Sequence, residues 1–178
     1  MDEQRVVIIG FSGSGKSTMA QQLGKKYSCK VLHLDCVHWM PGWRERDKDD
    51  RERIVSGFLD ENQSWVIDGT YRSVCFKRRF DSATHIIILN FPMYICLFRV
   101  IRRYLMYRGK SRESMTAGCR ERISAEFLWW ILYRGRNKAQ KDFFRQVGID
   151  YFEKTIILKT PSEVKKFWER GDLSWKKQ

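Results

Sequence analysis

Gly10-Phe11-Ser12-Gly13-Ser14-Gly15-Lys16-Ser17 fits the pattern of a nucleotide phosphate loop, in which a glycine and four further residues precede Gly-Lys-Ser. The run before it, Val6-Val7-Ile8-Ile9, is apolar and β-branched, as in a parallel strand that is buried on both faces. The residues after it, 17–27, predict a helix with an inward side made of Met19, Ala20, Leu23 and Tyr27. The motif therefore lies between a strand and a helix, which is where a phosphate loop is found.

The residue types of this loop predict that it binds ATP and Mg²⁺. Its glycines let consecutive backbone N–H groups point at phosphate oxygens, and the start of the helix adds a partial positive charge. Lys16 is expected to reach the β and γ phosphates, and the Ser17 hydroxyl is expected to ligate Mg²⁺. An accidental Gly/Ser turn is the alternative. The expected nucleotide contacts are Gly10, Ser12, Gly13, Ser14, Gly15, Lys16, Ser17 and Thr18.

The composition favours one globular α/β domain over residues 1–178. The hydrophobic content of 43% is enough for a core, and the longest apolar region, 85–101, is interrupted by Asn90, Pro92 and Arg99. That region is expected to form a strand and a helix, so no membrane partner is predicted. The cysteines are odd in number and lack Cys-x-x-Cys spacing, which favours free thiols and a cytoplasmic location. The oligomeric state is left open.

Two further apolar runs end in aspartate. Residues 31–35 end at Asp35 and residues 65–68 end at Asp68, and the carboxyl ends of parallel strands form the ligand edge of an open sheet. Asp35 is expected to accept a proton from a substrate hydroxyl or to hold a Mg²⁺-bound water, with a helix cap as the alternative. Asp68 has the form of a Walker B carboxylate and is expected to support the metal. Residues 85–89 and 155–158 predict the fourth and fifth strands.

An acceptor-binding helical insert is expected over about 36–63. Trp39, Trp43 and Arg44 surround a Pro-Gly turn, and aromatic rings interleaved with guanidinium groups suit a planar or phosphorylated ligand. Packing and solvated charge are an equally open interpretation. The expected substrate contacts are Asp35, Trp39, Trp43, Arg44, Asp68, Gly69 and Arg72, with Arg72 as a clamp on an acceptor phosphate.

The positive charge is concentrated in one third of the chain. The net charge is +13, and residues 93–146 contain many more basic than acidic side chains, so this segment is expected to meet a polyanion, either nucleotide phosphate or nucleic acid. Within it, an apolar stripe of Tyr94, Phe98, Ile101 and Leu105 is expected to be buried. That leaves the arginines Arg99, Arg102 and Arg103 on a different flank, available for ligands.

A basic lid is predicted over about 108–122. Arginines on a loop that closes over phosphate would neutralise charge during transfer and exclude water, and the candidates are Arg108, Arg112, Arg120 and Arg122. A merely basic surface loop is the alternative. The following run 127–133 is apolar on all sides, so core packing is expected, with a partner or membrane-surface helix as the second possibility.

Several motifs resemble known kinases. The phosphate loop, the run Asp68-Gly69-Thr70-Tyr71-Arg72 and the arginine-rich lid resemble adenylate kinase and related nucleoside monophosphate kinases. Nearly the whole chain is similar to the bacterial adenylate-kinase-related proteins called topology modulation proteins. The motifs that carry this likeness are His33-Leu34-Asp35, Trp39-x-Pro41-Gly42-Trp43, Trp65-Val66-Ile67-Asp68-Gly69, Tyr107-Arg108-Gly109-Lys110 and Gly118-Cys119-x-Glu121-Arg122.

The resemblance implies a P-loop NTPase fold of three α/β/α layers with a five-stranded parallel sheet in the order 2-3-1-4-5. It also implies that Lys159, Thr160 and Pro161 lie near the adenine. Adenylate kinases typically carry Asp-Gly-Phe-Pro-Arg after the third strand, whereas Thr70 and Tyr71 depart from it here, so the acceptor is left open. Asp35 also resembles the acceptor-binding or base aspartate of uridine and shikimate kinases.

The leading hypothesis is a small-molecule kinase that transfers the γ-phosphoryl group of ATP to a nucleotide, a nucleoside or another small hydroxyl or phosphate acceptor. The alternative is a nucleotide-regulated protein that binds DNA independently of sequence and affects DNA topology, because the basic third of the chain could follow a phosphate backbone. A GTPase is disfavoured because Asn137-Lys138-Ala139-Gln140 lacks the aspartate of the guanine motif.

Overall fold

A parallel sheet of five strands forms the centre of the protein. The structure is a computed structural model that describes residues 3–109, 114–119, 123–171 and 173. The strands are β1 (Arg5–Gly10), β2 (Lys30–His33), β5 (Trp65–Asp68), β6 (His85–Leu89) and β7 (Thr155–Leu158). They lie in the order β2-β5-β1-β6-β7, which is 2-3-1-4-5 when these five are numbered along the chain.

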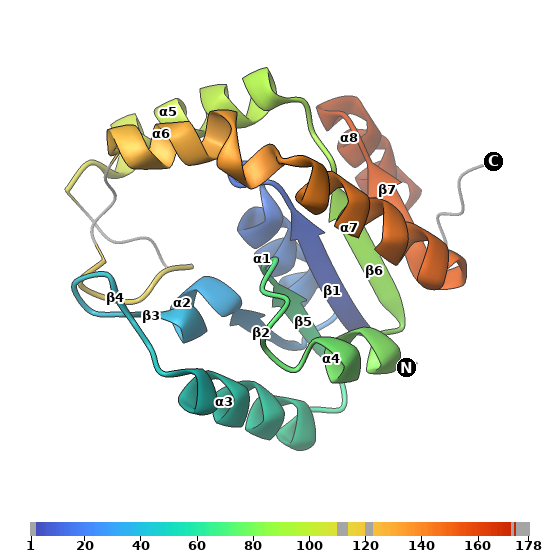
Figure 1. The fold of residues 1–178 in the computed structure, drawn as a ribbon. Coiled ribbons are helices and arrows are strands. Elements are labelled where there is room, and N and C mark those ends of the chain that lie inside the picture. Colours follow the sequence, from blue (N-terminus) through green and yellow to red (C-terminus); the bar gives the residue numbers. More distant parts are fainter. Residues whose placement is uncertain (1–2, 110–113, 120–122, 172, 174–178) are drawn as a thin grey trace.

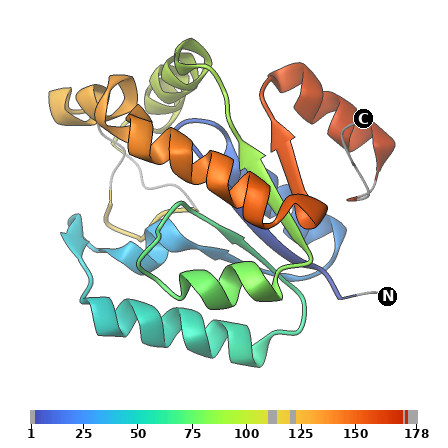
Figure 2. The same cartoon turned by 45° about the vertical axis from the view of Figure 1, so that its right-hand side comes forward.

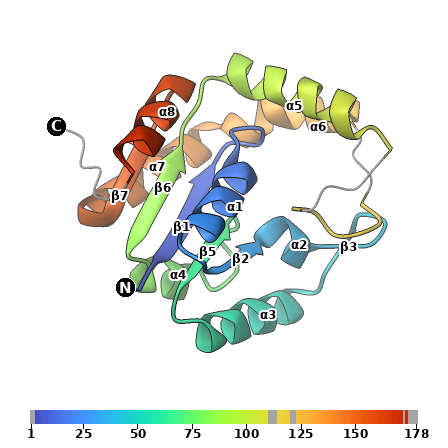
Figure 3. The same ribbon diagram turned by 180° about the vertical axis from the view of Figure 1, so that it is seen from behind.

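Helices cover both faces of the sheet. Helices α1 (Lys16–Lys26) and α8 (Pro161–Arg170) lie on the face seen in Figure 3, and α4 (Phe76–Ser82) and α7 (Lys138–Asp150) lie on the face seen in Figure 1. Figure 2 shows α7 crossing this second face. The predicted inward residues Met19, Ala20 and Leu23 of α1 are buried. The central strand β1 is buried from Val6 to Gly10, and Val6, Val7 and Ile8 have no exposed surface.

The segment between β2 and β5 is more varied than the helical insert that the sequence predicts. It contains the short helix α2 (Leu34–His38), the antiparallel hairpin β3 (Trp39–Met40) and β4 (Arg44–Glu45), and the helix α3 (Lys48–Glu61). Strand β2 ends at His33, so Asp35 lies in the first turn of α2 and not on the strand itself. The Pro-Gly turn forms the tip of the hairpin, which explains why the pattern there is not helical.

Two helices, α5 (Met93–Tyr107) and α6 (Ala125–Leu132), run side by side beyond the carboxyl ends of the strands (Figures 1 and 3). The short 3₁₀ helix η1 (Arg134–Arg136) follows α6, and η2 (Phe152–Lys154) precedes β7. Among the described residues, none of the helices combines the length and the apolar character needed to cross a bilayer.

The predicted buried stripe of α5 is wrong. Tyr94 and Leu105 are each 70% exposed, Phe98 is 66% exposed and Ile101 is 44% exposed, whereas the buried residues of this helix are Cys96 and Val100. The phosphate loop packs on the side of α5 that carries Cys96 and Val100, since a Cβ atom at Gly13 would lie 2.6 Å from the Cys96 carbonyl oxygen and 2.7 Å from Val100 Cγ2. The larger apolar side chains therefore lie on the opposite side of the helix.

The apolar run 127–133 is also not the core helix that its composition suggests. Only Ile131 of α6 is buried, while Trp129, Trp130 and Tyr133 are each about half exposed or more. Helix α6 packs on α5 and not on the sheet, so most of its surface has no layer to cover it. The five cysteines carry free thiols, as their number and spacing predict.

Candidate functional site

The phosphate loop joins β1 to α1 in a conformation that requires glycine. Gly13 has φ of 78°, and a Cβ atom built there would lie 2.6 Å from the Cys96 carbonyl oxygen of α5. Gly15 has φ of 97° and is the residue that precedes α1 as its N-cap. No side chain caps this helix start, so its free backbone N–H groups face the loop. The loop therefore has the glycine conformations and the uncapped helix start on which the predicted anion site depends.

Two polar side chains of the loop, Lys16 and Ser14, are partly or fully buried. The Lys16 ammonium donates to the Phe11 carbonyl oxygen at 3.0 Å, so the side chain folds back over the loop. Burial lowers the pKa of Lys16, and the nearby carboxylates of Asp35 and Asp68 oppose this shift. The Ser14 hydroxyl is buried, and no hydrogen-bond partner for it occurs among the described residues.

Ser17 and Asp68 form the pair that the sequence assigns to a metal. The Ser17 hydroxyl donates to one oxygen of Asp68 at 2.8 Å, and His33 Nδ1 contacts the other oxygen. His33 and Asp68 are direct neighbours in the register of β2 and β5, which explains their contact. Among the described residues, no three His, Cys, Asp or Glu side chains gather as a metal cluster. A divalent cation at this pair would therefore take its other ligands from phosphate and water.

Asp35 has an unexpected partner in Tyr71. The Tyr71 hydroxyl donates to an Asp35 oxygen at 2.8 Å, and burial together with this carboxylate raises the pKa of Tyr71 far above its ordinary value. Tyr71 also contacts the ring of His38, which in turn contacts Trp39. The Tyr71 hydroxyl therefore stays protonated at physiological pH, and its hydrogen bond fixes the orientation of the Asp35 carboxylate.

An aromatic chain extends outward from this aspartate. The ring centroids of Trp39 and Trp43 lie 5.6 Å apart on the hairpin, so the two predicted tryptophans are brought together. Arg51 of α3 lies 2.6 Å from His38 Nδ1, and burial together with Arg51 lowers the pKa of His38. A neutral imidazole can accept the guanidinium hydrogen bond. The rings of Tyr71, His38, Trp39 and Trp43 therefore form a continuous series of contacts that begins at Asp35.

One cavity connects the phosphate loop with Asp35. It has a volume of about 670 Å³ and is lined by residues 12–18, Asp35, Arg99, Arg103 and Ser114, among others. The Arg99 guanidinium donates to the Ser14 carbonyl oxygen at 2.7 Å, so it lies directly on the loop. Of the three α5 arginines that were expected to be available for ligands, Arg99 and Arg103 face this cavity.

Several predicted site residues lie elsewhere. Arg72 donates to the Ala139 carbonyl oxygen at 3.0 Å and stacks on Phe143 of α7, and it does not line the cavity. Arg44 is exposed on β4. The Arg108 guanidinium lies over the ring of Tyr104 on α5. These arginines are therefore separate from the phosphate loop in this conformation.

The remaining predicted residues have mixed positions. Gly69 packs against Leu34 at the end of β5, beside Asp68. Thr160 accepts from the Glu163 N–H as the cap of α8, next to Lys159 and Pro161, and the cavity reaches α8 only at Val164. Arg112, Arg120 and Arg122 lie outside the described residues, so the lid assignment for them stays a prediction.

The sequence reasoning missed three supporting side chains. The Thr70 hydroxyl accepts from the Gly10 N–H and donates to the Gly10 carbonyl oxygen, which ties the loop after β5 to the phosphate loop. Arg79 is buried and donates to the Tyr71 carbonyl oxygen. Arg136 lies over the ring of Phe11, with 3.9 Å between the guanidinium carbon and the ring centre. Of these three residues, only Thr70 stood out in the sequence, because it departs from the adenylate kinase motif.

No family model and no curated protein sequence matches the chain. Among solved structures, the chain is similar to an unliganded sugar kinase from a Janibacter species, at 18% sequence identity and a TM-score of 0.49. The match covers 95% of this chain and 92% of that chain. At this identity and TM-score the similarity carries no inference about substrate or mechanism.

Proposed function

We propose that this protein is an ATP- and Mg²⁺-dependent small-molecule kinase of the P-loop NTPase class, which transfers the γ-phosphoryl group to a hydroxyl of its acceptor. The observation that carries the proposal is the cavity of about 670 Å³ that brings Asp35 to the phosphate loop. A carboxylate beside a phosphate site is what proton removal from an acceptor hydroxyl requires.

The residues present fit ATP and Mg²⁺. The buried Ser14 hydroxyl without a described partner and the folded-back Lys16 are donors that polyphosphate oxygens would engage. Gly13 leaves a space on the loop that no side chain could enter without meeting α5. Ser17 and Asp68 offer the oxygen ligands that Mg²⁺ prefers, and bound Mg²⁺ would neutralise phosphate charge during transfer.

Asp35 orients the acceptor and receives its proton. As the acceptor oxygen bonds to the γ-phosphorus, its proton passes to the Asp35 carboxylate, and the bond from that phosphorus to the β–γ bridging oxygen breaks, so that ADP leaves with the electron pair. The Tyr71 hydroxyl, 2.8 Å from one Asp35 oxygen, holds the carboxylate in direction while the other oxygen faces the acceptor. Tyr71 is therefore a positioning residue.

Positive charge on the loop side stabilises the transferring group. Lys16 would contact the β and γ phosphates, and Arg99 and Arg103 line the same cavity from α5. The lid arginines Arg108 and Arg112, together with Arg120 and Arg122, are proposed to add to this charge when nucleotide is bound. We propose that these cations act on the donor phosphates and that the rings of Trp39 and Trp43, which lie outside the lining of the cavity, contact the acceptor.

The narrower proposal is a phosphotransferase related to adenylate kinases and topology modulation proteins that uses a hydroxyl acceptor in place of a nucleotide phosphate, and the phosphate loop and the run from Asp68 to Arg72 support this relationship. Arg72 contacts α7, so a phosphate clamp at this residue has no support in the described contacts. No observation in the described part of the chain favours the DNA-binding alternative.

The test is ADP formation from Mg-ATP with a panel of matched acceptors. Each pair contains a hydroxyl compound and its phosphorylated form, for example a nucleoside with its 5′-monophosphate and a sugar with its sugar phosphate. The proposal predicts ADP release that depends on a hydroxyl acceptor and is absent from Lys16→Ala. ATP binding without acceptor-dependent release for any member of the panel would contradict it.

A further inference from the structure

Exposed apolar side chains gather on the helices beyond the strand ends. The described residues include thirteen exposed large hydrophobic side chains, and ten of these belong to α5, to α6 or to Tyr133 directly after α6. The other three, Ile54, Ile149 and Phe152, are scattered over other elements. Single exposed apolar residues need no explanation, but a contiguous group on neighbouring helices indicates an interaction surface.

The α5 part of this group forms a regular stripe. Tyr94, Phe98, Ile101 and Leu105 follow one another at spacings of four, three and four residues, which places them on one side of the helix. Their exposed fractions run from 44 to 70%. The opposite side of α5 carries Cys96 and Val100 against the phosphate loop, so a partner on the stripe would leave the nucleotide cavity open.

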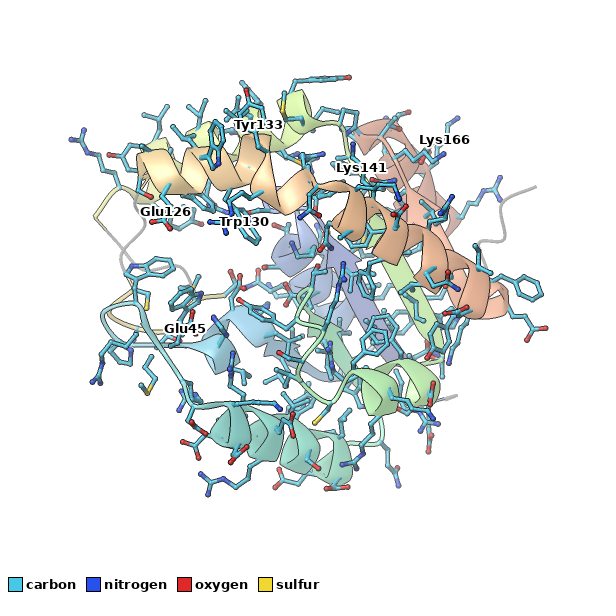
Figure 4. All side chains as sticks on the ribbon, viewed as in Figure 1. Glu45, Glu126, Trp130, Tyr133, Lys141 and Lys166 are labelled. Carbon is cyan, nitrogen blue, oxygen red and sulfur yellow. The ribbon has the colours of Figure 1, made fainter. Side chains whose placement is uncertain are left out.

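Helix α6 extends the stripe sideways. Trp129 and Tyr133 are more than half exposed, and their ring centroids lie 4.3 Å apart. Figure 4 shows Tyr133 on the side of α6 that faces away from the sheet, and Trp130 on the other side. We define the α5–α6 face by its exposed residues Tyr94, Phe98, Ile101, Leu105, Met106, Trp129 and Tyr133.

Basic side chains outnumber acidic ones around this face, where Glu126 of α6 is the acidic neighbour of Trp129 among the described residues. Helix α5 contains three arginines and no aspartate or glutamate, and Arg102 is exposed directly beside the stripe. Arg108 at the end of α5 and Arg134 after Tyr133 are also exposed. An apolar face bordered by arginines is complementary to a partner that has negative charge at its surface and an apolar layer below that surface.

Among possible occupants, an anionic lipid surface meets both requirements. A second copy of the chain would bring arginine borders of like charge together, which opposes association. A nucleic acid backbone would satisfy the arginines but offers no apolar volume for Leu105 and Met106. A bilayer takes up aliphatic side chains below the headgroups, and tryptophan and tyrosine favour the headgroup level.

We propose that the α5–α6 face docks on an anionic lipid bilayer, with α5 lying in the plane of the interface. The expectation of no membrane partner came from the lack of a spanning segment, and an interfacial helix needs none. This proposal does not depend on the kinase proposal, because none of the residues that define the face lines the nucleotide cavity.

The test is sedimentation of the full chain with vesicles of phosphatidylcholine alone or mixed in equal parts with phosphatidylglycerol. The protein is expected to sediment with the anionic vesicles and to be released by high salt. The double variant Phe98→Ser/Leu105→Ser should bind about tenfold more weakly or worse, because two apolar side chains no longer enter the interface. Arg102→Gln should weaken binding about fivefold.

The matched control is Ile149→Ser/Phe152→Ser, which removes two equally exposed apolar side chains far from the face. It should bind vesicles like the unchanged protein, and circular dichroism melts should show that both double variants remain folded. Three results would overturn the proposal: no sedimentation with anionic vesicles, an equal loss in the control, or a dimer that only Phe98→Ser/Leu105→Ser dissociates while vesicles leave it intact. The last result would assign the face to a second copy.

Discussion

Replacing Gly13 with alanine tests the close contact between the phosphate loop and α5. The new Cβ atom would lie 2.6 Å from the Cys96 carbonyl oxygen and 2.7 Å from Val100 Cγ2, and Gly13 has φ of 78°. The left-handed backbone costs about 1–2 kcal/mol for an L-residue. Displacing the backbone of α5 adds about 1–3 kcal/mol, as overpacking does elsewhere. Gly13→Ala should therefore lower the free energy of unfolding by about 3 kcal/mol.

The assay is urea unfolding followed by circular dichroism, with Gly57→Ala as the control. With a slope of about 2 kcal/mol per molar urea, the Gly13→Ala midpoint should fall by about 1.5 M. Gly57 lies in the middle of α3 with nothing within 4 Å of an added Cβ, so its replacement should raise stability by about 0.5–1 kcal/mol.

The same variant has a consequence for the loop. Because the added Cβ would push the loop and α5 apart, the loop should distort as well, and the affinity for Mg-ATP should fall together with stability. The reasoning is refuted if Gly13→Ala unfolds at the midpoint of the unchanged protein. Unchanged stability would mean that the loop does not pack on α5 at Gly13.

Three further variants test single contacts. Asp35→Asn should slow phosphoryl transfer by about 10²–10⁴-fold while ATP affinity changes little, and an equal loss of both would argue against a role in proton removal. Thr70→Val removes both hydrogen bonds to Gly10 and should cost about 1–3 kcal/mol in urea unfolding, whereas a neutral effect would deny its role in fixing the loop. Burial and the bond to Asp81 raise the pKa of Tyr151 to about 12. The unfolded chain releases this proton near its ordinary pKa of 10, so the contribution of Tyr151 is complete below pH 10 and is lost as pH rises toward 12. Tyr151→Phe should therefore lose less stability than the unchanged protein over that interval in alkaline unfolding, and identical losses would disprove the assignment.

The sequence predicted the five strands because they are short and apolar, and the resemblance to adenylate kinases implied their arrangement in one parallel sheet. Residues 65–68, 85–89 and 155–158 form strands with the predicted bounds, and the glycine pattern of residues 10–17 placed the loop between β1 and α1. These features can be recognised from the local sequence. A strand that is buried on both faces is a continuous apolar run, without the alternation of polar and apolar residues seen in half-exposed strands.

The orientation of α5 could not be predicted in the same way. Its apolar stripe at 94, 98, 101 and 105 has the period of a core helix, but the available neighbour is the phosphate loop, which leaves room only for Cys96 and Val100. Which side of a helix faces inward thus depended on a contact with residues more than eighty positions away. The hydrogen bond between Tyr71 and Asp35 joins residues that are 36 positions apart and lie in different local patterns, so spacing could not reveal it.

The most direct test of the kinase proposal is the fate of the γ-phosphoryl group. The protein would be incubated with Mg²⁺ and ATP labelled at the γ-phosphorus, together with the hydroxyl acceptor that gives the most ADP. We predict that the label appears in a phosphate ester of that acceptor and that Lys16→Ala, with its loop otherwise intact, transfers none. Label recovered only as inorganic phosphate, or equal transfer by both proteins, would contradict the proposal.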